Sequence, residues 1–263
     1  MRRIGLLAVA VFMLSTGVAE AAHRTDGSTP APAEIARLAT HVPASTLNQV
    51  GAGKIFGQRR FTVTKLSGAQ LTSGGKPELL ASELAWCPHC AADSWALTVA
   101  LSRFGSFSGL RWIDSGTLYG TKYHAHPSYP DTKGISFFGA RYRSRYLSFV
   151  NVILQDVAGH NLQHPTPAEQ NAVSGFDSQG IIPAVDIGGM YGFVNSAFSP
   201  GALAHKSWSQ IVGNLKDAKS PIAQRIDGLA NLFTAAICKA TNGQPAAVCN
   251  SGGVLAAGGA RLR

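Results

Sequence analysis

Two cysteines that stand three positions apart, Cys87 and Cys90, enclose one proline and one histidine. Residues at positions i and i+3 on the first turn of a helix lie on one face, close enough for a disulfide to close. The N–H groups at a helix N-terminus carry about half a positive charge, which favours a thiolate at Cys87. Because a thiolate attacks disulfides and also leaves them readily, the spacing predicts a pair that exchanges disulfides.

The two residues between the cysteines favour an oxidising pair. Pro88 stiffens the turn, and its missing N–H costs nothing at the first helical position. His89 can add positive charge or a hydrogen bond to the thiolate. Both effects stabilise the reduced form and make the disulfide more oxidising. From position alone, we expect Cys87 to attack a client and Cys90 to resolve the mixed disulfide.

A metal site and a structural disulfide are the other two interpretations of this pair. A structural zinc site takes four ligands, usually with a second cysteine pair at similar spacing. Cys238 and Cys249 stand too far apart for that, so we expect no metal and no cofactor. Two histidine pairs are expected in surface loops: His124 with His126, and His160 with His164.

The chain starts with the three-part layout of a secretory signal peptide. Arg2 and Arg3 precede an apolar run that ends at Val18, and cleavage is expected after Ala21. An uncleaved anchor is the alternative, but the run is shorter than the ~20 residues that a spanning helix needs. We therefore expect an exported protein in the periplasm, the cell envelope or the medium, with no stable membrane span after cleavage.

Export changes how the four cysteines are interpreted, because disulfides form and persist outside the cytosol. Four cysteines permit three pairings. The spacing favours Cys87 with Cys90 and Cys238 with Cys249, since the other pairings would draw the C-terminal segment onto the first motif. The second pair is expected to be a structural disulfide, and the alternative is a second redox pair that exchanges electrons with the first.

Composition describes a folded, basic chain of 263 residues. Hydrophobic residues are 45% and charged residues 14%, which excludes a wholly disordered chain. The formal net charge is +9 at pH 7, and Arg141, Arg143 and Arg145 alternate with a period that predicts one exposed strand face. Since the chain has no recognisable motif that reads bases, nucleic acid is not an expected partner.

Periodicity and turn residues divide the rest of the chain into elements. A strand-length run from Lys76 leads into a helix that starts at Pro88, so Cys87 is expected at a strand-to-helix junction. Thr166 and Glu169 have the spacing of a capping box. The expected segments are a signal peptide, 1–21; a flexible linker, 22–34; an N-terminal extension, 35–75; a core, 76–219; a helical segment, 220–250; and a flexible tail, 251–263.

Three stretches together resemble a known family: KPELLASELAWCPHCAADSWALTVALSRFGSFSGL, PAVDIGGMY and FTAAICKATNGQPAAVC. The family is the uncharacterised bacterial and archaeal domain-of-unknown-function family 929 (DUF929), and the resemblance covers most of the chain after about Val42. It implies an α/β fold with a thioredoxin-like sheet flanked by helices, and no established activity. The tetrapeptide CPHC also resembles that of DsbA-type thiol oxidases.

The resemblance implies a further site residue and leaves one role unfilled. Thioredoxin-like folds hold a cis-proline loop opposite the dithiol, and Pro183 directly before a strand fits that loop. Many family members have an acid two positions before the first cysteine, where this chain has Ala85, and thioredoxins have a buried aspartate at the position of Ala81. The nearest acid is Glu83, so no proton acceptor for Cys90 is identified.

The leading hypothesis is therefore an exported thiol:disulfide oxidoreductase. It would exchange disulfides with protein clients through Cys87 and Cys90, and a further redox partner would restore the pair. The alternative is a non-catalytic envelope protein or binding module in which both cysteine pairs are structural disulfides.

Overall fold

The structure of the chain is a computed structural model, which describes residues 26–55, 58, 60–115, 129 and 131–262. The expected signal peptide with Ala21 lies outside the described residues, as do His124 and His126.

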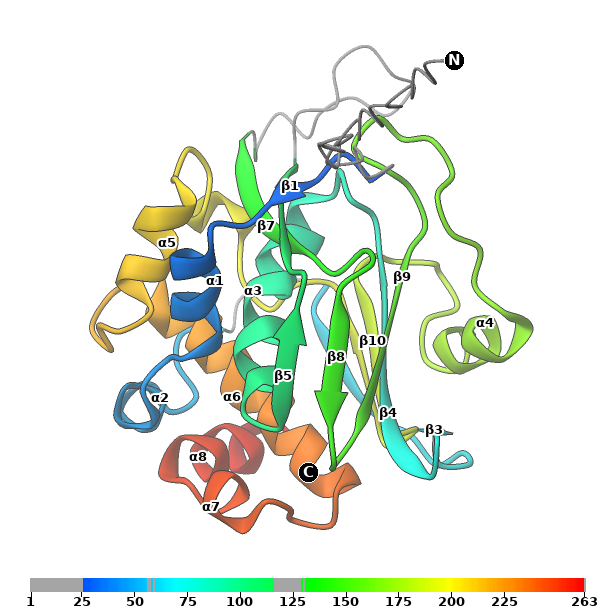
Figure 1. The fold of residues 1–263 in the computed structure, drawn as a ribbon. Helices are drawn as coiled ribbons and strands as arrows, with labels where there is room; N and C mark the ends of the chain where they lie inside the picture. Colours follow the sequence, from blue (N-terminus) through cyan, green and yellow to red (C-terminus); the bar gives the residue numbers. More distant parts are fainter. Residues whose placement is uncertain (1–25, 56–57, 59, 116–128, 130, 263) are drawn as a thin grey trace, which may run out of the picture.

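The centre of the fold is a mixed sheet (Figure 1). Its six strands are β2 (Thr62–Lys65), β3 (Thr72–Ser73), β4 (Lys76–Glu83), β9 (Ser148–Ile153), β10 (Ala184–Ile187) and β11 (Tyr191–Val194). Strand β4 lies parallel to β9 and antiparallel to β10, which pairs with β11 through a turn at Gly188 and Gly189. The order β9–β4–β10–β11 with one parallel pair is that of a thioredoxin-like sheet, which confirms the expected fold class.

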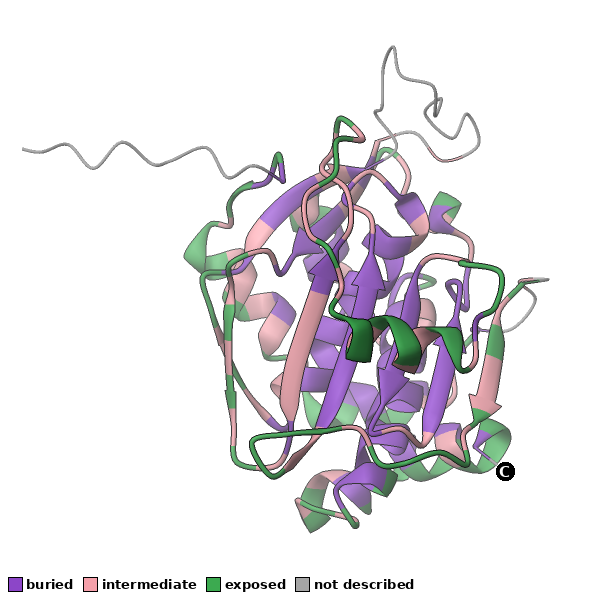
Figure 2. Cartoon of the chain, turned by 90° about the vertical axis from the view of Figure 1, so that its right-hand side faces the viewer, coloured by how far each residue is buried: buried purple, intermediate pink, exposed green. Residues whose placement is uncertain are grey.

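Helices cover both faces of this sheet. Helices α3 (Pro88–Ser102) and α6 (Ala223–Ala240) pack on one face, where Phe193 and Phe233 meet edge to face with 5.1 Å between ring centroids. Helix α4 (Pro167–Ser174) lies over the other face, and Figure 2 shows it, largely exposed, in front of buried strands. The capping box that Thr166 and Glu169 predict is present at the start of α4.

A small second sheet packs against α3, on the side away from α6. It consists of β1 (Thr29–Pro30), β6 (Arg111–Ser115) and β7 (Thr132–Ser136). Strand β7 approaches α3 closely because Gly134 has no side chain: a Cβ there would lie 2.7 Å from that of Ala91. Ser94 on α3 accepts a hydrogen bond from the backbone N–H of Ile135. These contacts hold β6 and β7 over the first turns of α3.

The remaining elements surround these two sheets. Strands β5 (Gly105–Ser108) and β8 (Arg141–Ser144) form a separate antiparallel pair. Its three arginines are exposed, as their spacing predicts: Arg141, Arg143 and Arg145. The other helices are α1 (Ala33–Thr40), α2 (Ala44–Val50), the 3₁₀ turn η1 (Pro200–Ala202), α5 (Trp208–Asn214), α7 (Ala246–Cys249) and α8 (Gly252–Arg261).

The C-terminal segment corrects one prediction. Residues 251–263 were expected to be a flexible tail, but Gly252–Arg261 form α8 and bury Val254 and Ala257. Its glycines allow a close approach: a Cβ on Gly253 would lie 2.4 Å from the carbonyl oxygen of Leu47. The glycine content that looked like a flexible sequence is therefore what lets α8 pack on its neighbours.

The expected linker is also ordered over its described part. Residues 29 and 30 form β1 at the edge of β6, and the side chains of Asp26 and Ser28 are buried. The polar composition of the linker gave no sign of this order. Ser136, which bonds Asp26, and Arg111, which bonds Ser28, lie more than eighty positions away in the sequence. In the described part of the chain, no helix is long and apolar enough to cross a membrane.

Candidate functional site

The two cysteines of CPHC lie at the junction between β4 and α3, as predicted. Cys87 is the N-cap of α3, and its Sγ accepts a hydrogen bond from the backbone N–H of Cys90 at 3.4 Å. Cys90 Sγ accepts one from the N–H of Leu84, also at 3.4 Å. Both cysteines are free thiols, 7% and 4% exposed respectively. The structure therefore brings the two thiols together at the start of α3, and both are largely covered.

The two thiols have opposite acidities. The pKa of Cys87 is lowered, chiefly by a hydrogen bond from the Cys90 thiol, with help from the backbone N–H groups of Cys90 and His89. The pKa of Cys90 is raised well above its ordinary value, chiefly by burial and then by its neighbour Cys87. Cys87 is thus the more acidic of the two thiols, and which cysteine attacks a client stays a prediction.

Pro88 and His89 occupy the first turn of α3. Pro88 stands at the first helical position, where no N–H is needed. The ring of His89 lies edge-on to that of Tyr129, with 5.5 Å between their centroids. The backbone N–H of His89 helps to lower the pKa of Cys87.

A buried carboxyl group that the motif search did not assign lies under the dithiol. Glu83 ends β4 on the same face of the sheet as Ala81, and it is 4% exposed. Its Oε2 accepts a hydrogen bond of 2.6 Å from Asn151, whereas Oε1 has no partner among the described residues. Burial raises the pKa of Glu83 to about 7, and its charge raises the pKa of Cys90. Glu83 is therefore a buried acid that borders the same cavity as Cys90, in a site where the sequence identified no proton acceptor.

A second buried acid lies one helical turn after Cys90. Asp93 is 1% exposed, and its pKa is raised well above the ordinary value, first by burial and then by the charges of Glu83 and Cys87. The nearby hydroxyl of Ser196 opposes this shift. Two acids within six positions of a dithiol, in otherwise apolar segments, are the signal in the sequence that could have identified both.

Replacing Glu83 with glutamine should remove a pH dependence of stability. Since the folded-state pKa is raised, the stabilising effect of protonated Glu83 is complete below the ordinary value of 4.5 and is lost as pH rises to about 7. That interval corresponds to about 3 kcal/mol. Urea unfolding of the reduced protein at several pH values should show wild-type stability falling by this amount relative to Glu83→Gln.

The comparison between the two proteins reports Glu83 and its effect on neighbouring acids. Asp93 also carries a raised pKa and adds its own decline with pH in both proteins, and the charge of Glu83 contributes to that shift. A difference between wild type and Glu83→Gln that stays constant across this range would contradict a raised pKa for Glu83.

The expected cis-proline loop lies at the same end of the sheet. The Ile182–Pro183 peptide bond is cis, as predicted. Pro183 is buried and directly precedes β10, whose first residue, Ala184, is in register with Ser82 near the end of β4. The carbonyl of Pro183 accepts a hydrogen bond from the N–H of Asn195.

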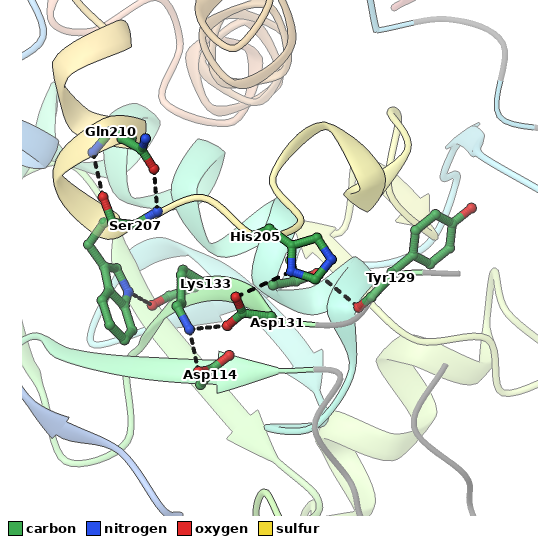
Figure 3. Close-up of polar contacts among 10 residues, drawn as sticks. Asp114, Tyr129, Asp131, Lys133, His205, Ser207 and Gln210 are labelled. Carbon is green, nitrogen blue, oxygen red and sulfur yellow. Dashed lines mark hydrogen bonds and ion pairs between the residues drawn. The ribbon is translucent and has the colours of Figure 1, made fainter. Parts of the chain in front are cut away.

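A cluster of charged side chains lies next to Tyr129, the residue whose ring contacts that of His89 (Figure 3). Lys133 donates hydrogen bonds to the carboxylates of Asp114 and Asp131, and His205 Nδ1 lies 3.6 Å from Asp131. The hydroxyl of Thr132 then donates to the carbonyl of Tyr129 at 3.1 Å. This cluster joins β6, β7 and the loop before α5, and so fixes the backbone at Tyr129.

The other predicted residues are accounted for as follows. Cys238 and Cys249 form a disulfide that joins α6 to α7, as the spacing favours. His160 and His164 are exposed, and His160 bonds Asp156. Across the described residues, no three His, Cys, Asp or Glu side chains gather in a way that could hold a metal ion.

The comparisons with known proteins give a family and no function. The model of a family described as "Domain of unknown function (DUF929)" matches residues 62–168, which confirms the resemblance over that stretch. The match includes β4, the dithiol and α3, and it ends at the start of α4, so it is narrower than the expected span from about Val42 onward. No curated protein and no solved structure matches the chain.

Proposed function

We propose that this chain, which carries a DUF929 domain over residues 62–168, is an exported thiol:disulfide oxidoreductase that acts on protein clients. The observation that carries the proposal is the asymmetry of the pair. Cys87 caps a helix and accepts a backbone N–H, whereas Cys90 is buried one turn further on beside a carboxyl group. Such an arrangement gives one nucleophile and one resolving thiol.

The chemistry would proceed in two exchanges. The Cys87 thiolate attacks one sulfur of a client disulfide, and the other client sulfur leaves as a thiolate that takes up a proton. Cys90 then gives its proton to Glu83 and attacks the sulfur of Cys87, which releases the second client sulfur. The client gains two electrons, and the dithiol becomes a disulfide. The reverse sequence transfers a disulfide to the client, with Glu83 returning the proton to Cys90.

The compartment of the proposal comes from the start of the chain. The signal-like segment that ends at Ala21 supports export, and an oxidising compartment suits the disulfide between Cys238 and Cys249. The redox partner that would restore the pair after each cycle is a second, separate protein or thiol pool.

The alternative function, a binding module held by two structural disulfides, requires a stable bond between Cys87 and Cys90. A redox titration against glutathione separates the two functions, with free cysteines alkylated and the products identified by mass spectrometry. The exchange function predicts a reduction potential above about −300 mV for Cys87 and Cys90, and a lower potential would support a structural disulfide.

The disulfide between Cys238 and Cys249 should be structural. It closes a loop with a sequence separation of 11 and ties α6 to α7, and both cysteines are buried. The double substitution Cys238→Ala and Cys249→Ala should lower the free energy of unfolding by about 3 kcal/mol. Disulfide transfer by the folded double variant should match that of the wild type, and a loss of transfer would identify a second redox pair.

A further inference from the structure

A small cavity lies beside the resolving cysteine. Its volume is about 20 Å³, and it is lined by Cys90, Glu83, Ser136 and neighbouring residues of β6, β7 and β9. A water molecule needs roughly 10–15 Å³ and two to four polar partners. The thiol of Cys90, the free oxygen of Glu83 and the hydroxyl of Ser136 supply such partners.

The hydroxyl of Ser136 leads out of this cavity. It donates a hydrogen bond of 2.5 Å to Oδ2 of Asp26 and accepts one from the N–H of Phe138 at 3.2 Å. A serine hydroxyl has one donor and two acceptor positions, so one acceptor position stays available for a water in the cavity. Ser136 is 2% exposed and Asp26 0% exposed, so this chain of groups is shielded from bulk solvent.

The carboxylate of Asp26 connects the buried chain to a cation nearer the surface. Its Oδ1 accepts hydrogen bonds from the N–H and the hydroxyl of Ser28, at 3.1 and 2.7 Å. The hydroxyl of Ser28 in turn accepts one from Nε of Arg111 at 2.9 Å, and Arg111 is only half-buried. The positive charge of Arg111 lies near the carboxylate of Asp26, and the hydroxyl of Ser28 joins the two.

Glu83 can accept the proton of Cys90 only while it is ionised. Burial raises its pKa to about 7, so below that pH it is largely protonated and a second acceptor is needed. Asp93 also interacts with Cys87, but it is 1% exposed and its pKa is raised as well. The polar chain through Ser136 starts at the cavity that Glu83 and Cys90 share, and it ends beside Arg111.

We propose that this cavity binds one water molecule, and that Ser136 and Asp26 take up the proton of Cys90 through that water when Glu83 already carries a proton. This inference rests on the proposed function. In that case the Cys90 S–H bond breaks, its proton passes to the water, a water proton passes to Ser136, and the Ser136 proton passes to Asp26. The remaining electron pair on Cys90 forms the bond to Cys87, and the proton returns along the same chain when Cys90 becomes a thiol again. Ser136 on β7 and Asp26 in the N-terminal segment are thus proton-carrying groups.

A chromogenic aryl disulfide tests this route without a protein client. Cys87 of the reduced full chain reacts first and releases one aryl thiolate, and Cys90 then displaces the second. The leaving group needs no proton, so the second release reports how readily Cys90 loses its own. The rate is measured at about pH 6, where Glu83 is largely protonated, and at about pH 8, where it can accept a proton.

We expect Ser136→Ala and Asp26→Asn to slow the second release at least about tenfold at the lower pH and much less at the higher pH. Glu83→Gln should show the opposite pattern. Ser115→Ala is the matched control: Ser115 is 1% exposed and borders the same cavity, but its proton is committed to the carbonyl of Ala85 at 2.6 Å. It should change the rate by less than about twofold.

Three results would overturn the inference. These are wild-type release at the lower pH in both Ser136→Ala and Asp26→Asn, equal slowing in Ser115→Ala, and release of one aryl thiolate per chain in the wild type. Far-ultraviolet circular dichroism checks that each variant is folded. A wild type that releases both thiolates but transfers no disulfide to proteins would refute the proposed function and leave the proton route intact.

Discussion

Replacing Cys87 with serine should abolish disulfide transfer to a reduced, unfolded client. Serine keeps the N-cap, since its oxygen can accept the same backbone N–H that the sulfur of Cys87 accepts now. It removes the only thiol of the pair whose pKa is lowered. Cys90 remains, but its pKa is raised well above the ordinary value, so it supplies almost no thiolate at neutral pH. Transfer should fall to the uncatalysed rate.

Cys90→Ser provides the matched comparison for that experiment. Given a client that contains a disulfide, this variant keeps the nucleophile and loses the resolving thiol, so it should accumulate a mixed disulfide between Cys87 and the client. Non-reducing electrophoresis separates this species from free protein. Equal transfer by wild type and Cys87→Ser would refute an exchange function, and a mixed disulfide that forms in Cys87→Ser but not in Cys90→Ser would reverse the two roles.

The parts of the site that the sequence predicted are those set by local chemistry. The spacing of Cys87 and Cys90 requires a helix start, and Pro88 fits only the first position of that helix. The turn glycines 188 and 189 separate two strands whose pairing follows from their adjacency. The family resemblance added the cis bond before Pro183, which no local pattern would have identified.

The parts that the sequence did not predict depend on contacts between distant segments. Glu83 acquires its raised pKa from burial, and the hydrogen bond from Asn151 on a neighbouring strand opposes that shift. Asp26 looked like one polar residue of a linker, because its partner Ser136 is 110 positions away. Burial of a polar side chain is decided by what covers it, and composition carries no information about that cover.

The largest expected loss of stability concerns Arg103, which joins the segment expected to be a flexible tail to the core. Arg103 follows α3, and its guanidinium donates to Asn231 and Thr234 on α6 and to Ser251 at the start of α8, at 3.0, 3.3 and 3.0 Å. Burial lowers the pKa of Arg103 to about 10, and the charge of Asp227 opposes that shift. The guanidinium is therefore charged at neutral pH and largely withdrawn from water.

Replacing Arg103 with methionine should lower the free energy of unfolding by about 3 kcal/mol or more, because two buried acceptors and the partly buried Ser251 lose a charged donor. Methionine keeps the length and the apolar contacts of the side chain. Urea unfolding measures the loss. Relative to the wild type, hydrogen exchange should accelerate more for the amides of α8 than for those of α3.

Arg37→Met is the matched control for Arg103→Met, since Arg37 makes a two-nitrogen contact with Glu34 on the exposed face of α1. Exposed ion pairs of this kind contribute little, so this variant should unfold close to the wild type. If both variants lost stability equally, charge removal in general would be the cause. If Arg103→Met unfolded like the wild type with unchanged exchange in α8, the contact between Arg103 and Ser251 would not be what anchors the C-terminal helix.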